Sequence, residues 1–373
     1  MKQGIIGIDR CYGDAVRMLL ARMLDAGVIR AAVVPVESPG GTKIDLMLVG
    51  SKAGLERSRP MAPYFFGNRA LGVSRLTRLG ELPERTAAVL RPCELRSVIE
   101  LGKLRQVSRE NLLLICTDCP GTLPAKDFRE KKAARADFHA LLTKACLAGR
   151  DIEGAREACT VCLHPSLEAH ADLVVGTFGQ ERSVLLLAAS ARGEEALGAL
   201  GLDEASPAQV SARREALARM ASARKARREA WRAGLGFAVG KLEALQRHFD
   251  ACEQCRACSE ICPVCYCKQC AFKLAAMETD GAARLLKAME LDAVALPGSS
   301  LLFHLGRMTH MAHACTGCGA CTEACPAGID VARAFIAAGE AVQALFGYEA
   351  GRDPAEPMPL TVFREQELEE EIR

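Results

Sequence analysis

Eighteen of the 373 residues are cysteines, and eight of these fall into two copies of one motif. Each copy reads CxxCxxCxxxCP; the first begins at Cys252 and the second at Cys315. Three closely spaced thiolates can hold three irons of a 4Fe-4S cubane, whereas the fourth cysteine points away and ligates the other cluster. The spacing therefore predicts a dicluster domain. The expected ligands are Cys252, Cys255, Cys258 and Cys325 for cluster 1, and Cys315, Cys318, Cys321 and Cys262 for cluster 2.

Zinc and unmetallated thiols are the alternatives for clustered cysteines. Zinc requires only four thiolates, typically in two CxxC pairs, and so does not account for a repeat of eight. A glycine at position 317 or 319 also suits a loop that approaches sulfide closely, where backbone N–H groups tune the reduction potential. The repeat therefore favours iron–sulfur clusters over both alternatives.

A long segment, residues 264–314, separates the two motifs, unlike the arrangement in a small ferredoxin. It holds three more cysteines, interpreted as small buried residues beside the clusters, with further metal ligands as the alternative. It also holds three histidines, interpreted as packing or capping residues because each thiolate set is already complete. These residues are Cys265, Cys267, Cys270, His304, His310 and His313.

A second constellation surrounds a predicted strand–helix–strand unit. Apolar runs at 86–92 and 111–118 flank a helical pattern at 93–107, so the two strands are expected to be parallel. Their carboxyl ends form the edge where ligands bind in open α/β sheets. The thiols at this edge and in the CxxC pair that follows could hold a third cluster, a zinc ion or a redox dithiol. They are Cys93, Cys116, Cys119, Cys159 and Cys162.

Composition excludes several function classes. A net charge of +2 and only 5% aromatic residues do not favour nucleic-acid binding. The N-terminus lacks the apolar core of a signal peptide, and no apolar run is long enough for a membrane span. We therefore expect a cytoplasmic protein whose thiols stay reduced. The sequence also lacks CxxCH, GxGxxG and P-loop motifs, so covalent haem, a dinucleotide fingerprint and a P-loop are not indicated.

Four segments resemble the beta-subunit family of deazaflavin-reducing hydrogenases and formate dehydrogenases. RPCELRSVIELGKLRQVSRENLLLICTDCPGT and ACTVCLHPSLEAHADLVVG match the family as a whole. CSEICPVCYCKQC and FHLGRMTHMAHACTGCGACTEACP resemble the formate dehydrogenase branch, which appends a two-cluster ferredoxin domain. The resemblance covers roughly residues 60–345.

The resemblance implies an iron–sulfur electron-transfer subunit that contains FAD. The flavin would exchange a hydride with a deazaflavin coenzyme, and the clusters would pass single electrons to or from a partner. The resemblance assigns the third cluster to Cys93, Cys119, Cys159 and Cys162, with Cys116 in reserve. By analogy alone, Arg91, Asn68 and Ser74 are expected near the flavin.

The expected partners are catalytic or electron-accepting subunits of a hetero-oligomer, such as a formate dehydrogenase, a hydrogenase or a heterodisulfide-reductase-like complex. No molybdopterin or nickel site is evident, so the chain would be catalytic only through bound flavin and with such partners. The alternative is a flavin-free, polyferredoxin-like electron carrier or adaptor without a substrate site.

The expected fold is an α/β N-terminal flavin and cluster domain followed by an α+β bacterial-type dicluster ferredoxin domain. The expected units are a small α/β unit (1–60), a beta-subunit-like domain (61–195), a basic helical linker (196–244), the dicluster domain (245–345) and an acidic tail (346–373). The basic run of the linker is interpreted as a solvated helix face, with a docking surface for an acidic partner as the alternative.

Overall fold

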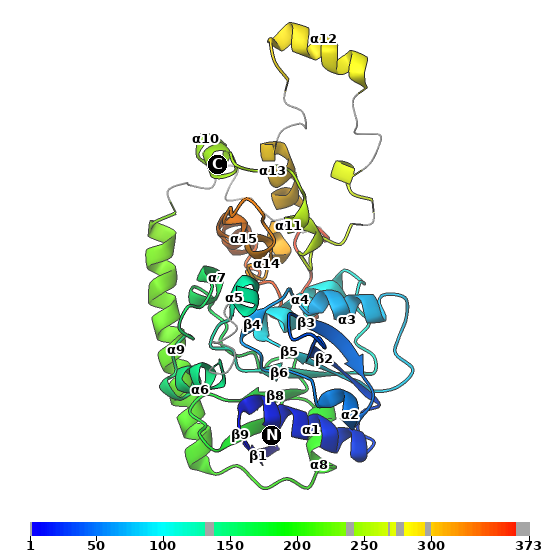
Figure 1. The fold of residues 1–373 in the computed structure, drawn as a ribbon, viewed down its shortest axis with the longest axis vertical. Helices are drawn as coiled ribbons and strands as arrows, with labels where there is room; N and C mark the ends of the chain where they lie inside the picture. Colours follow the sequence, from blue (N-terminus) through cyan, green and yellow to red (C-terminus); the bar gives the residue numbers. More distant parts are fainter. Residues whose placement is uncertain are drawn as a thin grey trace.

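The computed structural model describes residues 2–130, 138–235, 242–267, 269–273, 280–294 and 300–362. A sheet with helices on both faces forms one part of the molecule, and a helical part rises above it (Figure 1). The seven strands of the sheet lie in the order β1-β9-β8-β6-β5-β2-β3. Their bounds are β1 (Gln3–Gly7), β2 (Ala31–Glu37), β3 (Ile44–Val49), β5 (Thr86–Leu90), β6 (Leu112–Thr117), β8 (Leu173–Gly176) and β9 (Ser183–Ala188).

The four central strands β8, β6, β5 and β2 pair in parallel, and the flanking pairs β1–β9, β9–β8 and β2–β3 are antiparallel. The predicted strand–helix–strand unit is confirmed as β5, α4 (Pro92–Lys103) and β6. The unit expected over residues 1–60 does not form a sheet of its own, because β1, β2 and β3 join the strands of the following segment. Residues 64–65 (β4) and 123–124 (β7) form a second, two-stranded sheet.

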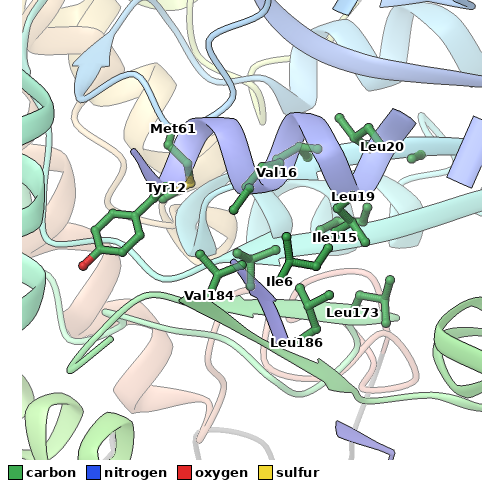
Figure 2. Packing of buried hydrophobic residues seen from close by; sticks show 14 of the residues in the cluster. Ile6, Tyr12, Val16, Leu19, Leu20, Met61, Ile115, Leu173, Val184 and Leu186 are labelled. Atoms are coloured by element: carbon green, nitrogen blue, oxygen red, sulfur yellow. The ribbon is translucent and has the colours of Figure 1, made fainter. Parts of the chain in front are cut away.

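Both faces of the main sheet are covered, which explains why β5, β6, β8 and β9 are buried along their whole length. On one face, Tyr12, Val16 and Leu19 of α1 (Tyr12–Asp25) pack against strand residues such as Ile115 and Leu186 (Figure 2). Parts of α6 (Phe138–Ala148), α8 (Ala191–Gly198) and α9 (Pro207–Ala233) complete this layer. The other face carries α3 (Ala70–Thr77) and α4.

Helix α9 begins where the sequence favours a helix start, with Ser206 and Gln209 in a capping box around Pro207. The helix is therefore present where the basic linker was expected, but it is not an exposed linker. Ala216 and Met220 lie in the sheet core, and Arg213 and Arg224 are buried in ion pairs with Asp118 and Asp151. Only part of the basic run is a solvated face.

The C-terminal part consists of helices and loops in its described residues. Its helices are α10 (Leu242–His248), α11 (Ala257–Glu260), α12 (Gly281–Leu291), α13 (Ser300–Met311), α14 (Ala320–Glu323) and α15 (Val331–Leu345). The α+β expectation for this domain is wrong over residues 242–267, 269–273, 280–294 and 300–362, where no strand occurs. The cysteine loops are instead packed between helices, with Phe249, Phe303 and Phe335 among the buried residues.

Helix α4 connects the two parts. Its Arg96 donates to the backbone oxygens of Ala350 (2.8 Å) and Thr316 (3.2 Å). Its fully buried Glu100 accepts hydrogen bonds from the Tyr348 hydroxyl and the Gly351 N–H, both at 2.7 Å. Residues 348–351 of the expected tail are therefore packed, whereas its acidic residues Glu365, Glu367, Glu369, Glu370 and Glu371 lie outside the described residues.

The short helices α2 (Lys52–Leu55), α5 (Ala125–Glu130) and α7 (Glu157–Thr160) connect the larger elements. Over the described ranges, none of the helices has the length and apolar character that crossing a bilayer requires.

Candidate metal centres and an adjoining cavity

The two cysteine loops of the C-terminal part adopt the same backbone conformation. In the second loop, Gly317 and Gly319 have φ of 68° and 71°. The equivalent positions of the first loop, Gln254 and Arg256, have φ of 55° and 61° although neither is glycine. Left-handed backbone costs a residue with a side chain about 1–2 kcal/mol. The first loop (residues 252–258) therefore bears this cost in order to adopt the conformation of the second (residues 315–321). Each of these groups of cysteines is called a nest below.

The fourth cysteine of each motif lies with the triplet of the other motif. Burial is the largest cause that raises the pKa of Cys258, and the neighbouring thiols that add to it include Cys255 and Cys325. Burial also raises the pKa of Cys262, together with Cys318 and Cys315. The structure thus brings Cys325 to the first loop and Cys262 to the second, as the alternating spacing predicts.

Hydrogen-bond donors surround the thiols of both loops. Arg307 donates to the Cys258 Sγ over 3.1 Å, and His304 Nε2 lies 3.4 Å from the Cys252 Sγ. In the second loop, the pKa of the buried Cys315 thiol is raised to about 11. Burial causes the rise, and a hydrogen bond donated by the Gly317 N–H opposes part of it. Donors of this kind stabilise thiolate, the form that ligates metal.

Two buried guanidinium N–H donors lack an acceptor in the part of the chain that the structure describes, which fits a bound group that carries acceptors in addition to the thiols. Arg307 Nε and Arg156 Nη1 have no hydrogen-bond partner among the described residues. Both belong to side chains that contact cysteines of the nests. The described part also holds no three His, Cys, Asp or Glu side chains that converge on a single ion. A cubane does not need such convergence, since each thiolate binds a separate iron and the sulfides accept hydrogen bonds.

The third nest lies at the carboxyl ends of β5 and β6. Cys93 is the second residue of α4, whose start is fixed by Pro92 and by Glu94, which accepts from the Arg91 N–H at 2.7 Å. Cys119 follows β6, and the pair Cys159 and Cys162 lies at and just after α7. Burial and Glu94 raise the pKa of Cys93, and Cys119 and Cys162 add to the shift. Cys159 in turn raises the pKa of Cys119, so all four thiols are neighbours.

Arginine side chains donate hydrogen bonds to the cysteines of this third nest. Arg224 of α9 donates to the backbone oxygens of Cys119 (3.2 Å) and Cys162 (3.5 Å). Arg156 donates to the Cys159 Sγ over 3.3 Å. Burial alone would raise the pKa of Cys159, but Arg156 and hydrogen bonds from Thr122 outweigh it, and the pKa is lowered. The site favours a thiolate at Cys159.

Arg156 also connects the third nest to the second loop of the dicluster part. The nitrogen that contacts Cys159 donates to the Cys318 backbone oxygen at 3.1 Å. A side chain at Gly319 would clash with Ala158, since an added Cβ would lie 2.6 Å from the Ala158 Cβ. The three nests therefore form a continuous series, with the second loop in the middle.

The other cysteines lie away from these nests or at their margin. Cys116 and Cys146 are fully buried in the two sheet cores, and Cys11 precedes α1. Cys265 lies beside Arg307, which donates a hydrogen bond that opposes the effect of burial on its pKa. Cys267 is exposed and Cys270 is half-buried. All eighteen cysteines are free thiols.

A cavity of about 640 Å³ adjoins the nests, within the usual size range of cofactor sites. Its walls come from the edge strand β3 and its neighbour β2, from α3 and from the loop around Asn68, and Ile261 of the dicluster part closes one side. An added Cβ at Gly67 would lie 3.2 Å from the Ile261 Cδ1, so glycine permits this close approach. Ile261 directly precedes the ligand candidate Cys262.

Two of the three residues expected near a flavin line this cavity. They are Asn68 and Arg91, whereas Ser74 is not among the lining residues and donates instead to the Gln106 backbone oxygen at 2.8 Å. The Arg91 guanidinium donates hydrogen bonds to the Glu94 carboxylate and to the Ala62 backbone oxygen. Arg75 also lines the cavity, is exposed, and has no charged or hydrogen-bonded partner in the described part of the chain.

Sequence reasoning did not find the arginines that serve the nests. Arg156, Arg224 and Arg307 each contact a cysteine that is distant in the sequence, by 162, 105 and 49 positions respectively, and only the fold brings them together. One signal was available for Arg307, which lies in the segment noted as resembling the formate dehydrogenase branch. His304, interpreted as a packing residue, packs on Phe249 and also reaches Cys252.

Comparison with known proteins agrees with this arrangement. The 4Fe-4S dicluster domain family matches residues 248–329. The F420-dependent formate dehydrogenase subunit beta of Methanocaldococcus jannaschii is 23% identical over 310 residues, which cover 75% of this chain and 77% of the relative. The F420-dependent formate dehydrogenase 1 subunit beta of Methanococcus maripaludis is 25% identical over 309 residues, or 74% and 75% of the two chains.

Among solved structures, a chain of the F420-reducing NiFe hydrogenase complex from Methanosarcina barkeri is similar, with a TM-score of 0.47 and 12% identity over 65% of this chain and 94% of that chain. The family resemblance predicted from the sequence is confirmed by the curated relatives. The chain is a relative of the beta subunits of F420-dependent formate dehydrogenases and carries a 4Fe-4S dicluster domain.

Proposed function

We propose that this chain is an electron-transfer subunit of a multi-subunit oxidoreductase, with three 4Fe-4S clusters and an FAD. The observation that carries the proposal is the continuous series of cysteine nests beside a cofactor-sized cavity. Clusters 1 and 2 take the ligands of the dicluster motifs, and Cys93, Cys119, Cys159 and Cys162 hold the third. Each cluster would take up and release one electron with little change in geometry.

The third cluster is supported by the charge of its surroundings. Four thiolates in a buried site need compensating positive charge, because burial disfavours every unpaired ion. Arg156 contacts a thiolate directly, and Arg224 donates to the backbone of two ligands. Arg91 lies close enough to lower the pKa of Cys119, which burial raises to about 11. Three guanidinium groups thus face four thiols.

The cavity beside these nests suits a flavin. Bound FAD would accept two electrons as a hydride and release them one at a time. The apolar walls of β2 and β3 would cover the ring system, and the exposed, unpartnered Arg75 would meet the phosphates. Arg91 and Ile261 lie on the cavity wall next to the third nest and to Cys262, so an electron would leave the cavity directly towards the clusters.

The partner surface lies at the first loop. Cys255 is the exposed member of the eight dicluster cysteines; the other seven are half-buried or buried. An exposed ligand brings its cluster close to the surface, where transfer to another protein is possible. The partner is then a catalytic or electron-accepting subunit, as the names of the relatives suggest, and the free thiols favour a reducing compartment such as the cytoplasm.

Flavin stoichiometry tests the proposal. The full chain would be assembled anaerobically with iron, sulfide and FAD, freed of unbound flavin, and measured by absorbance. We expect about one FAD per chain, and a marked loss in Arg75→Glu because a carboxylate would repel the phosphates. Arg78→Glu, also exposed just after α3 but outside the cavity, is the matched control and should keep the flavin. Chains with clusters but no flavin would identify a flavin-free electron carrier.

A further inference from the structure

Helix α13 lies in the long segment between the two cysteine motifs and packs on α15 (Figure 1). Three of its side chains, spaced at positions i, i+3 and i+7, share one face. Each brings a polar or sulfur atom to a different cysteine. His304 Nε2 lies 3.4 Å from the Cys252 Sγ, Arg307 donates to the Cys258 Sγ at 3.1 Å, and Met311 Sδ lies 3.8 Å from the Cys262 Sγ.

These three cysteines do not belong to one cluster. Cys252 and Cys258 are ligands of cluster 1, whereas Cys262 is the fourth ligand of cluster 2. The face of α13 therefore reaches both clusters, and Arg307 lies at its centre. Arg307 also lines, with Cys315, Cys318 and Cys321, the small space inside the second loop.

The positive charge of Arg307 is deeply buried and lacks a carboxylate partner. The side chain is 3% exposed, and no Asp or Glu pairs with it in the described part of the chain. Its second amino nitrogen donates to the Cys258 backbone oxygen at 3.2 Å, and the guanidinium lies 4.5 Å from the ring centre of Phe335. An isolated ion at this depth would be very costly, so negatively charged groups must compensate it.

One donor of this guanidinium points to a missing acceptor. Arg307 Nε is buried and has no partner among the described residues. Leaving such a donor unsatisfied is destabilising, and more so for a charged group. The thiolates and sulfides of the clusters would supply both the acceptor and the negative charge.

We propose that Arg307 sets the reduction potentials of both dicluster clusters, as a positioning residue that lies between them. The inference rests on the proposed function, since it requires both clusters to be bound. Reduction adds one electron to a cluster without forming or breaking a bond, so the cluster becomes more negative. A fixed cation in a poorly polarisable site stabilises that reduced state and raises the potential. His304 contacts Cys252 and no other cysteine among the described residues, so it affects cluster 1 alone.

The test is a redox titration of the full, anaerobically assembled chain with dithionite and mediators, followed by electron paramagnetic resonance. The cluster signals are assigned by their loss in Cys252→Ala and Cys315→Ala. In Arg307→Gln, both clusters should be harder to reduce. At the wild-type midpoint, the ratio of reduced to oxidised cluster should fall about tenfold, which corresponds to 59 mV for one electron. Arg307→Lys keeps the charge and should restore most of the potential.

Two histidine variants of α13 form a matched pair. His304→Gln should lower the potential of cluster 1 only, whereas His310→Gln changes an exposed residue of the same helix and should leave both potentials unchanged. Unchanged potentials in Arg307→Gln at full iron content would overturn the inference, as would a shift of one cluster alone.

A measurement on the wild type covers the case in which Arg307→Gln loses its clusters. Pulsed electron paramagnetic resonance with guanidino-15N-arginine should detect a nitrogen coupling at reduced cluster 1, and Arg307→Lys should lack it. Absence of this coupling in the wild type overturns the inference. A wild-type chain that forms neither cluster contradicts the proposed function itself, and the role of Arg307 falls with it.

Discussion

Replacement of Arg224 by methionine tests how the third nest is built. Arg224 is 1% exposed on α9 and pairs with Asp151 at 2.8 Å. Its other nitrogens donate to the backbone oxygens of Cys119 and Cys162, so one side chain fixes two of the four expected ligands. Methionine keeps much of the volume but removes the charge and all of these hydrogen bonds.

The expected loss of stability depends on the groups that lose Arg224 as their partner. Breaking a buried ion pair costs about 3–5 kcal/mol when the partner is left alone. Asp151 keeps a second partner, Arg227, so the lower limit of about 3 kcal/mol is the better estimate. The two backbone oxygens lose their donor as well, and the loops that carry Cys119 and Cys162 are no longer held together.

Iron analysis of the assembled chain measures this effect. The wild type should hold about twelve irons, four for each of three cubanes, and Arg224→Met should hold about eight. The resonance signals of the dicluster part should persist. Arg219→Met changes an exposed arginine of the same helix and should keep all twelve irons. Full iron content in Arg224→Met would refute the reasoning, because the nest would then not depend on this side chain.

Three further predictions concern the clusters, the pH dependence and the junction. Cys325→Ala should remove the signal of the cluster at Cys252 and spare the other; loss of the other signal would contradict the crossover. Burial and Arg96 lower the pKa of His164 to about 3 even though a Glu349 carboxylate oxygen lies 3.2 Å from its Nε2, so stability should be full above pH 6.5 and fall below it. Between pH 7 and 5 the loss is about 2 kcal/mol by denaturant unfolding and should be absent in His164→Gln. Glu100→Ala should cost about 3–5 kcal/mol in the same assay, because Lys103 then stays buried without its carboxylate; a cost as small as that of Glu110→Ala, at an exposed position, would contradict this.

Local patterns in the sequence predicted the sheet centre well. The apolar runs at 86–92 and 111–118 and the helical period between them correspond to β5, α4 and β6, and the parallel pairing follows from the crossover helix. The motif spacing was likewise sufficient to predict that Cys325 lies with the first loop, because the fixed geometry of a cubane links the two motifs although they are far apart in the sequence. These features depend on local periodicity and on one well-defined covalent geometry.

Features that depend on distant contacts could not be predicted. The pairing of β1 with β9 joins residues about 180 positions apart, and no local pattern specifies it. The basic run of α9 resembles a solvated face, but Arg213 and Arg224 are drawn inside by Asp118 and Asp151. The contacts of Arg307 with the cysteines could not be predicted for the same reason. A single arginine has no motif, and its role follows only from the packing of α13 against both loops.

Spin quantitation with metal analysis tests the central claim most directly. If the chain conducts electrons through three cubane clusters, the fully reduced, anaerobically assembled protein should contain about twelve irons, no zinc, and about three cluster spins. Two spins, about eight irons and one zinc would contradict the account, because the nest of Cys93, Cys119, Cys159 and Cys162 would then hold a structural ion and end the electron path at the dicluster part.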